Sequence, residues 1–152
     1  GSIHLIPTLC VYMALLPMIY ALAYPGNELN NLDILAAFLA IAAVIIQIIS
    51  DQQMFNFRKN LSEPKTMKSG LWYYSRHPNY FGEILFWFSL FVFALAANFN
   101  FAWLLVGTLI MYALIAIASV SMMDKRSLER RSDFKEYMDS TPAIFINIFK
   151  RG

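Results

Sequence analysis

The sequence predicts an all-α membrane protein: a bundle of about four transmembrane helices followed by a C-terminal amphipathic helix on the cytosolic side. Of the 152 residues, 59% are hydrophobic and only 14% are charged, and the charged residues are missing from long stretches. A soluble domain carries about 25% charged residues, whereas a membrane-crossing helix needs roughly 20 apolar ones. A soluble chain of this length could not bury several fully apolar helices, so that class is excluded.

The uncharged stretches locate the spans within a single membrane domain that covers residues 1–152. No charged residue occurs in Leu5–Asn27, in Ile34–Ser50, or between Glu83 and Asp124. The last stretch is long enough for two helices, and the asparagines of its segment AANFN favour a turn there. A Pro-Gly pair in YPGNELNN separates the first two spans in the same way. We therefore expect spans near 5–24, 33–52, 79–97 and 101–122.

The basic residues predict how these spans are oriented. All 12 Lys and Arg residues fall between the second and third spans or after the fourth. Loops rich in Lys and Arg stay in the cytoplasm, so segments 51–78 and 123–152 should lie on the cytosolic side. No signal peptide is expected, because the first span lacks a basic leading region. The net charge of +2 reflects this bias and does not indicate a nucleic-acid partner.

Several kinds of site are not expected. Cys10 is the single cysteine and lies within an apolar span, so neither a disulfide framework nor a thiolate metal site can form. The two histidines lie far apart in the sequence, and we expect no metal site. The sequence also lacks the glycine-rich loops that hold nucleotide phosphates in Rossmann and P-loop proteins.

A polar cluster in the segment SGLWYYSRHPNYFGEILFW directly precedes the third span. Pro78 suits the first turn of a helix and holds His77 outside it. A helix that begins there places Asn79 and Glu83 on one face, with Glu83 about one turn inside the apolar run. An ionisable group at that depth is costly unless it is paired or faces water, so it indicates a functional site with Arg76 as a partner. An aromatic belt explains the tyrosines, but it does not explain why Arg, His, Asn and Glu occur together here.

The segment SDQQMFNFRKN follows the second span. Asp51 and Arg58 are two helical turns apart, so they share a face if the second span continues as a helix. Capping by the aspartate and contact of the arginine with lipid headgroups explain the same residues without a site.

The segment DKRSLERRSDFKEY follows the fourth span. Read as one helix, it aligns Glu129, Asp133 and Tyr137 along a face. This helix either lies in the membrane interface or forms the far wall of an anion site. Guanidinium groups suit phosphates, so the three polar segments together favour a phosphate-bearing nucleotide cofactor.

Three strings, GLWYYSRHPNYFGE, SDQQMFNFRKN and LERRSDFKEY, closely resemble the C-terminal portion of the steroid 5α-reductase-like family, particularly its bacterial branch of unknown function. The resemblance covers about residues 45–149. Sterol C14 reductases and isoprenylcysteine carboxyl methyltransferases are similar more distantly, through the shared element RHPxY. The resemblance implies a membrane enzyme that uses NADPH to reduce a carbon–carbon double bond in a steroid-like or isoprenoid lipid. This chain would supply the cofactor-binding half, as the C-terminal part of a longer fold, in a bacterial inner membrane rather than the endoplasmic reticulum.

The resemblance also implies which residues bind the cofactor. Asp51 and Arg58 would contact its adenosine-phosphate half. The wall that holds the nicotinamide and the diphosphate would consist of Tyr74, Arg76, His77, Asn79 and Glu83. From the C-terminal segment, Glu129, Arg130 and Tyr137 would close the site. The groups that polarise the substrate and donate a proton belong to more N-terminal helices of such enzymes, so no catalytic residue is assigned.

Two alternative functions remain open. A methyltransferase that uses S-adenosylmethionine on an isoprenylated or phospholipid substrate also contains RHPxY, but it often carries Glu-Glu where this chain has Asp124-Lys125. The arginines at 58, 76 and 130 favour the dinucleotide, because they can bind its phosphates. The other alternative is a membrane scaffold without enzymatic activity.

Overall fold

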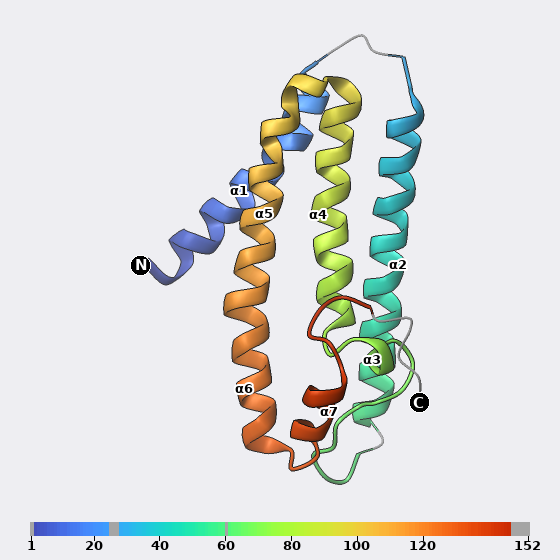
Figure 1. Cartoon of the computed structure of the whole chain (residues 1–152), viewed down its shortest axis with the longest axis vertical. Helices are drawn as coiled ribbons and strands as arrows, with labels where there is room; N and C mark the ends of the chain where they lie inside the picture. Colours follow the sequence, from blue (N-terminus) through green and yellow to red (C-terminus); the bar gives the residue numbers. More distant parts are fainter. Residues whose placement is uncertain (1, 25–27, 60, 147–152) are drawn as a thin grey trace.

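The structure is a computed structural model that describes residues 2–24, 28–59 and 61–146. The described residues form helices joined by turns, and four helical stretches among them are long and apolar enough to cross a membrane. In Figure 1, α2 (Asn31–Lys59) and α4 (Pro78–Ala97) run along the long axis beside the stretch that contains α5 and α6, while α1 (Ser2–Ala23) crosses them obliquely. The predicted multi-pass helical fold is confirmed.

The first two spans follow the predicted positions, but the second is longer. α2 begins with a reciprocal cap in which Asn30 Oδ1 accepts a hydrogen bond from the backbone N–H of Leu32 (2.8 Å), and Asp33 Oδ2 accepts one from Asn30 (2.9 Å). Such paired bonds satisfy N–H groups that have no partner at a helix start. The helix continues to Lys59 rather than stopping near 52, so it carries Asp51 and Arg58 together beyond the apolar run.

The third and fourth spans are separated by the predicted asparagine turn. α4 has Pro78 in its first turn, as its sequence predicts, and ends where Asn98 becomes extended and its side chain accepts a bond from the backbone N–H of Asn100 (2.8 Å). The chain then continues as the 3₁₀ segment η1 (Phe99–Leu104), α5 (Leu105–Ala113), the π-helical segment η2 (Leu114–Val120) and α6 (Ser121–Arg130). These form a single long span, Phe99–Arg130.

Glycines allow the backbones of the spans to approach closely. A Cβ at Gly82 of α4 would lie 2.8 Å from the carbonyl oxygen of Ala43 in α2, and one at Gly107 of α5 would clash with the carbonyl of Met13 in α1. Small residues at helix interfaces are typical of membrane bundles, because dispersion contacts replace the hydrophobic effect there. A larger residue at either position would therefore push α4 away from α2 or α5 away from α1.

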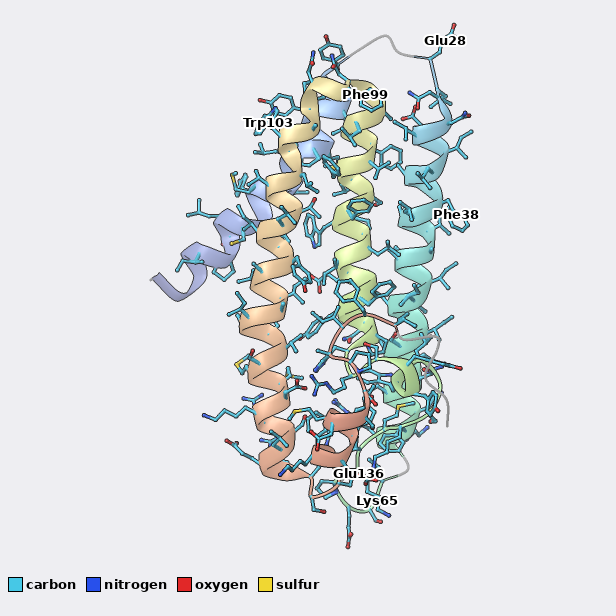
Figure 2. The ribbon with its side chains drawn as sticks, in the orientation of Figure 1. Glu28, Phe38, Lys65, Phe99, Trp103 and Glu136 are labelled. Atoms are coloured by element: carbon cyan, nitrogen blue, oxygen red, sulfur yellow. The ribbon has the colours of Figure 1, made fainter. Side chains whose placement is uncertain are left out.

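The side-chain distribution matches a bilayer around the bundle. Large apolar side chains point outward from the middle of the helices, such as Phe38 of α2, which is 67% exposed. Phe99 and Trp103 lie at one end, while the charged Lys65 and Glu136 lie at the other (Figure 2). Tyr20 also packs edge-on against Trp103 at the first end, with ring centroids 5.7 Å apart. Aromatic residues concentrate where a membrane meets water, so the bundle crosses between these two ends.

The expectation of one helix over 124–137 is wrong. α6 ends at Arg130, Arg131 is extended, and the chain folds back into α7 (Phe134–Ser140) (Figure 1). The break is stabilised by a tertiary contact, because Asp133 accepts hydrogen bonds from the hydroxyl (2.8 Å) and the backbone N–H (3.3 Å) of Thr66. Residues 147–152 of the predicted cytosolic segment lie outside the described residues.

Candidate functional site

The three polar segments meet at the end of the bundle formed by α3 (Leu71–Tyr74) and α7, which we call the α3/α7 end (Figure 1). They surround a cavity of about 270 Å³. Six of the residues that the resemblance implied line it: Asp51, Arg58, Arg76, His77, Asn79 and Tyr137. Segments far apart in the sequence therefore line a single cavity.

The α3 turn is docked onto α2 by polar contacts around Gly70. The backbone N–H of Leu71 donates to Gln53 Oε1 (3.0 Å), and the Trp72 indole donates to the carbonyl of Ser50 (3.1 Å). Gly70 has φ 62°, and a Cβ there would lie 2.6 Å from the Gln53 amide. Only glycine meets both demands without strain, so Gly70 lets the turn before α3 pack closely against α2.

Tyr137 joins α7 to the same turn. Its hydroxyl contacts the carbonyl oxygens of Trp72 and Ser75, the latter at 3.1 Å. Burial raises the pKa of Tyr137 well above its usual range, although Arg76 opposes the shift. The phenol therefore stays protonated and serves as a hydrogen-bond donor to the backbone. Tyr137 orders the wall of the cavity as well as lining it.

Arg76 and His77 share one carboxylate, that of Asp124 on α6. The guanidinium Nη2 of Arg76 lies 3.1 Å from Asp124 Oδ2, and His77 Nε2 lies 2.8 Å from Oδ1. The His77 ring also stacks on Tyr80, with centroids 5.5 Å apart. Arg76 thus pairs with Asp124 rather than with Glu83.

Two polar atoms of the cavity residues are buried without a hydrogen-bond partner among the described residues. They are Nε of Arg76, a donor, and Oδ1 of Asn79, an acceptor. A buried polar group without a partner costs about 1–3 kcal/mol, so such atoms need an explanation. Both residues line the cavity, and a ligand there could satisfy them.

Two arginines line the cavity in addition to Arg76. Arg58 comes from α2, and Arg131 comes from the turn after α6. Burial and the nearby Arg58 lower the pKa of Arg131, and Asp133 only partly opposes them. Neither arginine forms a salt bridge within the part of the chain that the structure describes. The two guanidinium groups therefore form a positive region at the cavity.

Four residues implied by the resemblance lie outside the cavity wall. Tyr74 faces away from it and packs edge-on against Tyr73 (5.0 Å). Glu83 lies deeper along α4 and is half-buried, whereas Glu129 and Arg130 are exposed on α6.

The cavity is lined instead by Ser127 of α6 and by Arg131 after it, while Asp124 on the same face contacts Arg76 of the wall. Residues three and four positions apart share a helix face, so this spacing could have identified them. The prediction of a helix that continues to Tyr137 instead favoured the face of α6 that carries Glu129.

Comparisons with known proteins give a family without a known activity. No solved structure matches the chain. An uncharacterized protein of Schizosaccharomyces pombe is 26% identical over 171 aligned residues, which cover 94% of this chain and 47% of that protein. The chain thus spans about half the length of this relative. The profile described as "Protein of unknown function (DUF1295)" matches residues 1–141, so the chain belongs to the DUF1295 family as a multi-pass helical membrane protein.

Proposed function

We propose that the protein is the cofactor-binding part of a membrane reductase that uses NADPH to reduce a carbon–carbon double bond in a steroid-like or isoprenoid lipid. The observation that carries this proposal is the positive region of Arg58 and Arg131 in the same cavity as the two unsatisfied buried atoms. The distribution of basic residues favours a cytosolic location for this cavity, where NADPH is present.

The positive region fits the phosphates of a dinucleotide. Two like charges close together repel, and an anion between them would relieve the repulsion. Arginine forks bind phosphate oxygens through paired hydrogen bonds, so Arg58 and Arg131 would hold the diphosphate or the 2′-phosphate. Asp51 is exposed and also lines the cavity, where its carboxylate could accept bonds from ribose hydroxyls.

The unsatisfied atoms fit the nicotinamide carboxamide. A primary amide offers one carbonyl acceptor and one NH₂ donor. Its carbonyl would accept from Arg76 Nε–H, and its NH₂ would donate to Asn79 Oδ1. Bound there, NADPH would supply a hydride, and the wall of Arg76, His77 and Asn79 would orient the ring.

The size of the cavity limits how much of the cofactor it encloses. Ligand pockets are typically about 300–1,000 Å³, and this cavity of about 270 Å³ lies just below that range. One half of a dinucleotide would be enclosed, while the other would extend over the exposed mouth near Arg58.

An apolar groove supports a lipid substrate. It has a volume of about 440 Å³ and lies between α4 and α5, with Phe81, Phe88 and Tyr112 in its lining. Phe81 directly follows Tyr80, which lines the polar cavity, so both features share one region of α4. A substrate tail could remain in the apolar part while its reactive end approaches the cofactor.

The second candidate is a methyltransferase that uses S-adenosylmethionine. Arg76 Nε and Asn79 Oδ1 would also fit the carboxylate and the ammonium of its amino-acid part. However, S-adenosylmethionine carries no phosphate, so it would leave Arg58 and Arg131 unused.

Thermal unfolding of the full chain in lipid nanodiscs separates these functions. Ligand at about 100 times its Kd stabilises a protein by about 2.7 kcal/mol, which corresponds to roughly 5–10 °C. We expect such a shift with NADPH and none with S-adenosylmethionine. A shift with S-adenosylmethionine alone would move the assignment to the methyltransferase, and no shift with either ligand would favour the scaffold.

A further inference from the structure

Asp124 is an acidic residue in a place where acids are costly. It lies on α6 just after the π-helical segment, within the fourth span, and is only 9% exposed. A buried charged group needs partners that replace its water, and it often marks a functional position. Both carboxylate oxygens are occupied, one by Arg76 and the other by His77. Asp124 therefore contacts two consecutive residues of the cavity wall at once.

The first effect of this contact is to orient the Arg76 guanidinium. Nη2 is held at 3.1 Å from Asp124, while Nη1 donates to the carbonyl oxygen of Met138 (3.4 Å). Two of the three guanidinium nitrogens are thus engaged with the protein, and Nε is the one without a partner among the described residues. With Nη1 and Nη2 each held by a protein contact, the plane of the guanidinium is fixed, and so is the direction of Nε–H.

The second effect is to select a tautomer of His77. A carboxylate only accepts hydrogen bonds, so the His77 Nε2 at 2.8 Å from Asp124 must carry a hydrogen. His77 is 6% exposed, and the stacking of its ring on Tyr80 restricts its rotation. Nδ1 is consequently the ring nitrogen left for a ligand.

We infer that Asp124 is a positioning residue: its carboxylate sets the direction of Arg76 Nε–H and the tautomer of His77, and so prepares both side chains for the cofactor. The inference rests on the proposed function only for the identity of that ligand. Asp124 itself does not touch the cofactor. Its substitution should act through its two partners, and the chain's resemblance to reductases did not indicate such a role.

The test measures NADPH affinity by calorimetry for the full chain in nanodiscs. Asp124→Asn keeps the shape of the side chain, but its amide has one acceptor oxygen, so it can keep both partners only if His77 Nε2 becomes an acceptor, which is the other tautomer. We expect affinity to fall roughly tenfold to a hundredfold, because a charged hydrogen bond is lost or misdirected. Asp139→Asn is the matched control, since Asp139 is exposed on α7, and it should bind as the wild type does.

A double-mutant cycle distinguishes positioning from general destabilisation. In an Arg76→Ala background, Asp124→Asn should lower affinity by clearly less than in the wild type, because only the contact with His77 is left to lose. Equal losses in both backgrounds would overturn the inference, since they would show that Asp124 acts independently of Arg76.

The tautomer can be measured without any ligand, even if Asp124→Asn does not fold. The chain has two histidines, so His4→Gln leaves a single imidazole for ¹⁵N NMR. We expect Nε2 of His77 to be protonated, and a ring protonated only at Nδ1 would overturn the inference. If the wild type fails to bind NADPH while the tautomer is as expected, the proposed function fails and the positioning role stands.

Discussion

Replacing Arg131 with glutamine separates the role of the cavity arginines from that of their neighbours. Arg131 lines the cavity, whereas Arg130 beside it is exposed on α6. A hydrogen bond to a charged group contributes about 1.5–3 kcal/mol, so Arg131→Gln should weaken NADPH binding by roughly tenfold to a hundredfold. Arg130→Gln removes the same charge from the next position and should change affinity by less than about threefold.

The same substitution should not destabilise the protein without ligand. Burial and the nearby Arg58 make the charged form of Arg131 unfavourable in the folded state, as the lowered pKa of Arg131 shows. Removing the charge also removes this repulsion, so the midpoint of thermal unfolding should stay the same or rise. Calorimetry of NADPH binding and thermal unfolding of both variants test the expected loss of affinity and the expected unfolding midpoint. An equal loss of affinity in the two variants, or no loss in either, would refute the reasoning.

Three further predictions concern the rest of the site. Gly70→Ala places a Cβ against the Gln53 amide at a positive φ. It should therefore lower the free energy of unfolding by about 1–2 kcal/mol, as measured by chemical denaturation. An unchanged free energy of unfolding would contradict the docking of α3 on α2. Burial alone would raise the pKa of Asp133, but the hydrogen bonds from Thr66 and the charge of Lys68 lower it. The ionised Asp133 therefore stabilises the fold above its unfolded pKa of about 3.9, and this stabilisation is lost as the pH falls through the lower pKa of the folded state. Thr66→Val should make the free energy of unfolding, measured by chemical denaturation, depend less on pH below about pH 4. Finally, the 3-acetylpyridine analogue of the oxidised cofactor lacks the amide NH₂, so the wild type should bind it more weakly than NADP⁺ by about 1–3 kcal/mol, while Asn79→Ala should bind both equally.

The spans and the start of α4 could be predicted because local features determine them. Gaps between charges set the length of each span, Pro78 sets the first turn of α4, and the asparagines at 98 and 100 make the turn after it. The shared face of Asp51 and Arg58 could also be predicted, because it requires only the helical period and the continuation of α2 to Lys59.

The geometry of the C-terminal segment could not be predicted, because distant contacts determine it. The break after Arg130 is accompanied by hydrogen bonds between Asp133 and Thr66, which are far apart in the sequence. The π-helical segment before α6 also departs from the α-helical period on which the expected faces of this span were based. Neither feature changes the hydrophobic pattern from which helices are inferred.

The most direct test of the central claim is a titration of the full chain in nanodiscs with NADPH, in which binding is monitored by the fluorescence of NADPH. We predict saturable binding that NADP⁺ reverses and S-adenosylmethionine does not. We also predict that binding is lost in the double variant Arg58→Ala/Arg131→Ala, while the variant retains the helical circular dichroism of the wild type. Absence of saturable binding to the wild type, or equal binding to the double variant, would contradict the assignment of this cavity to a dinucleotide.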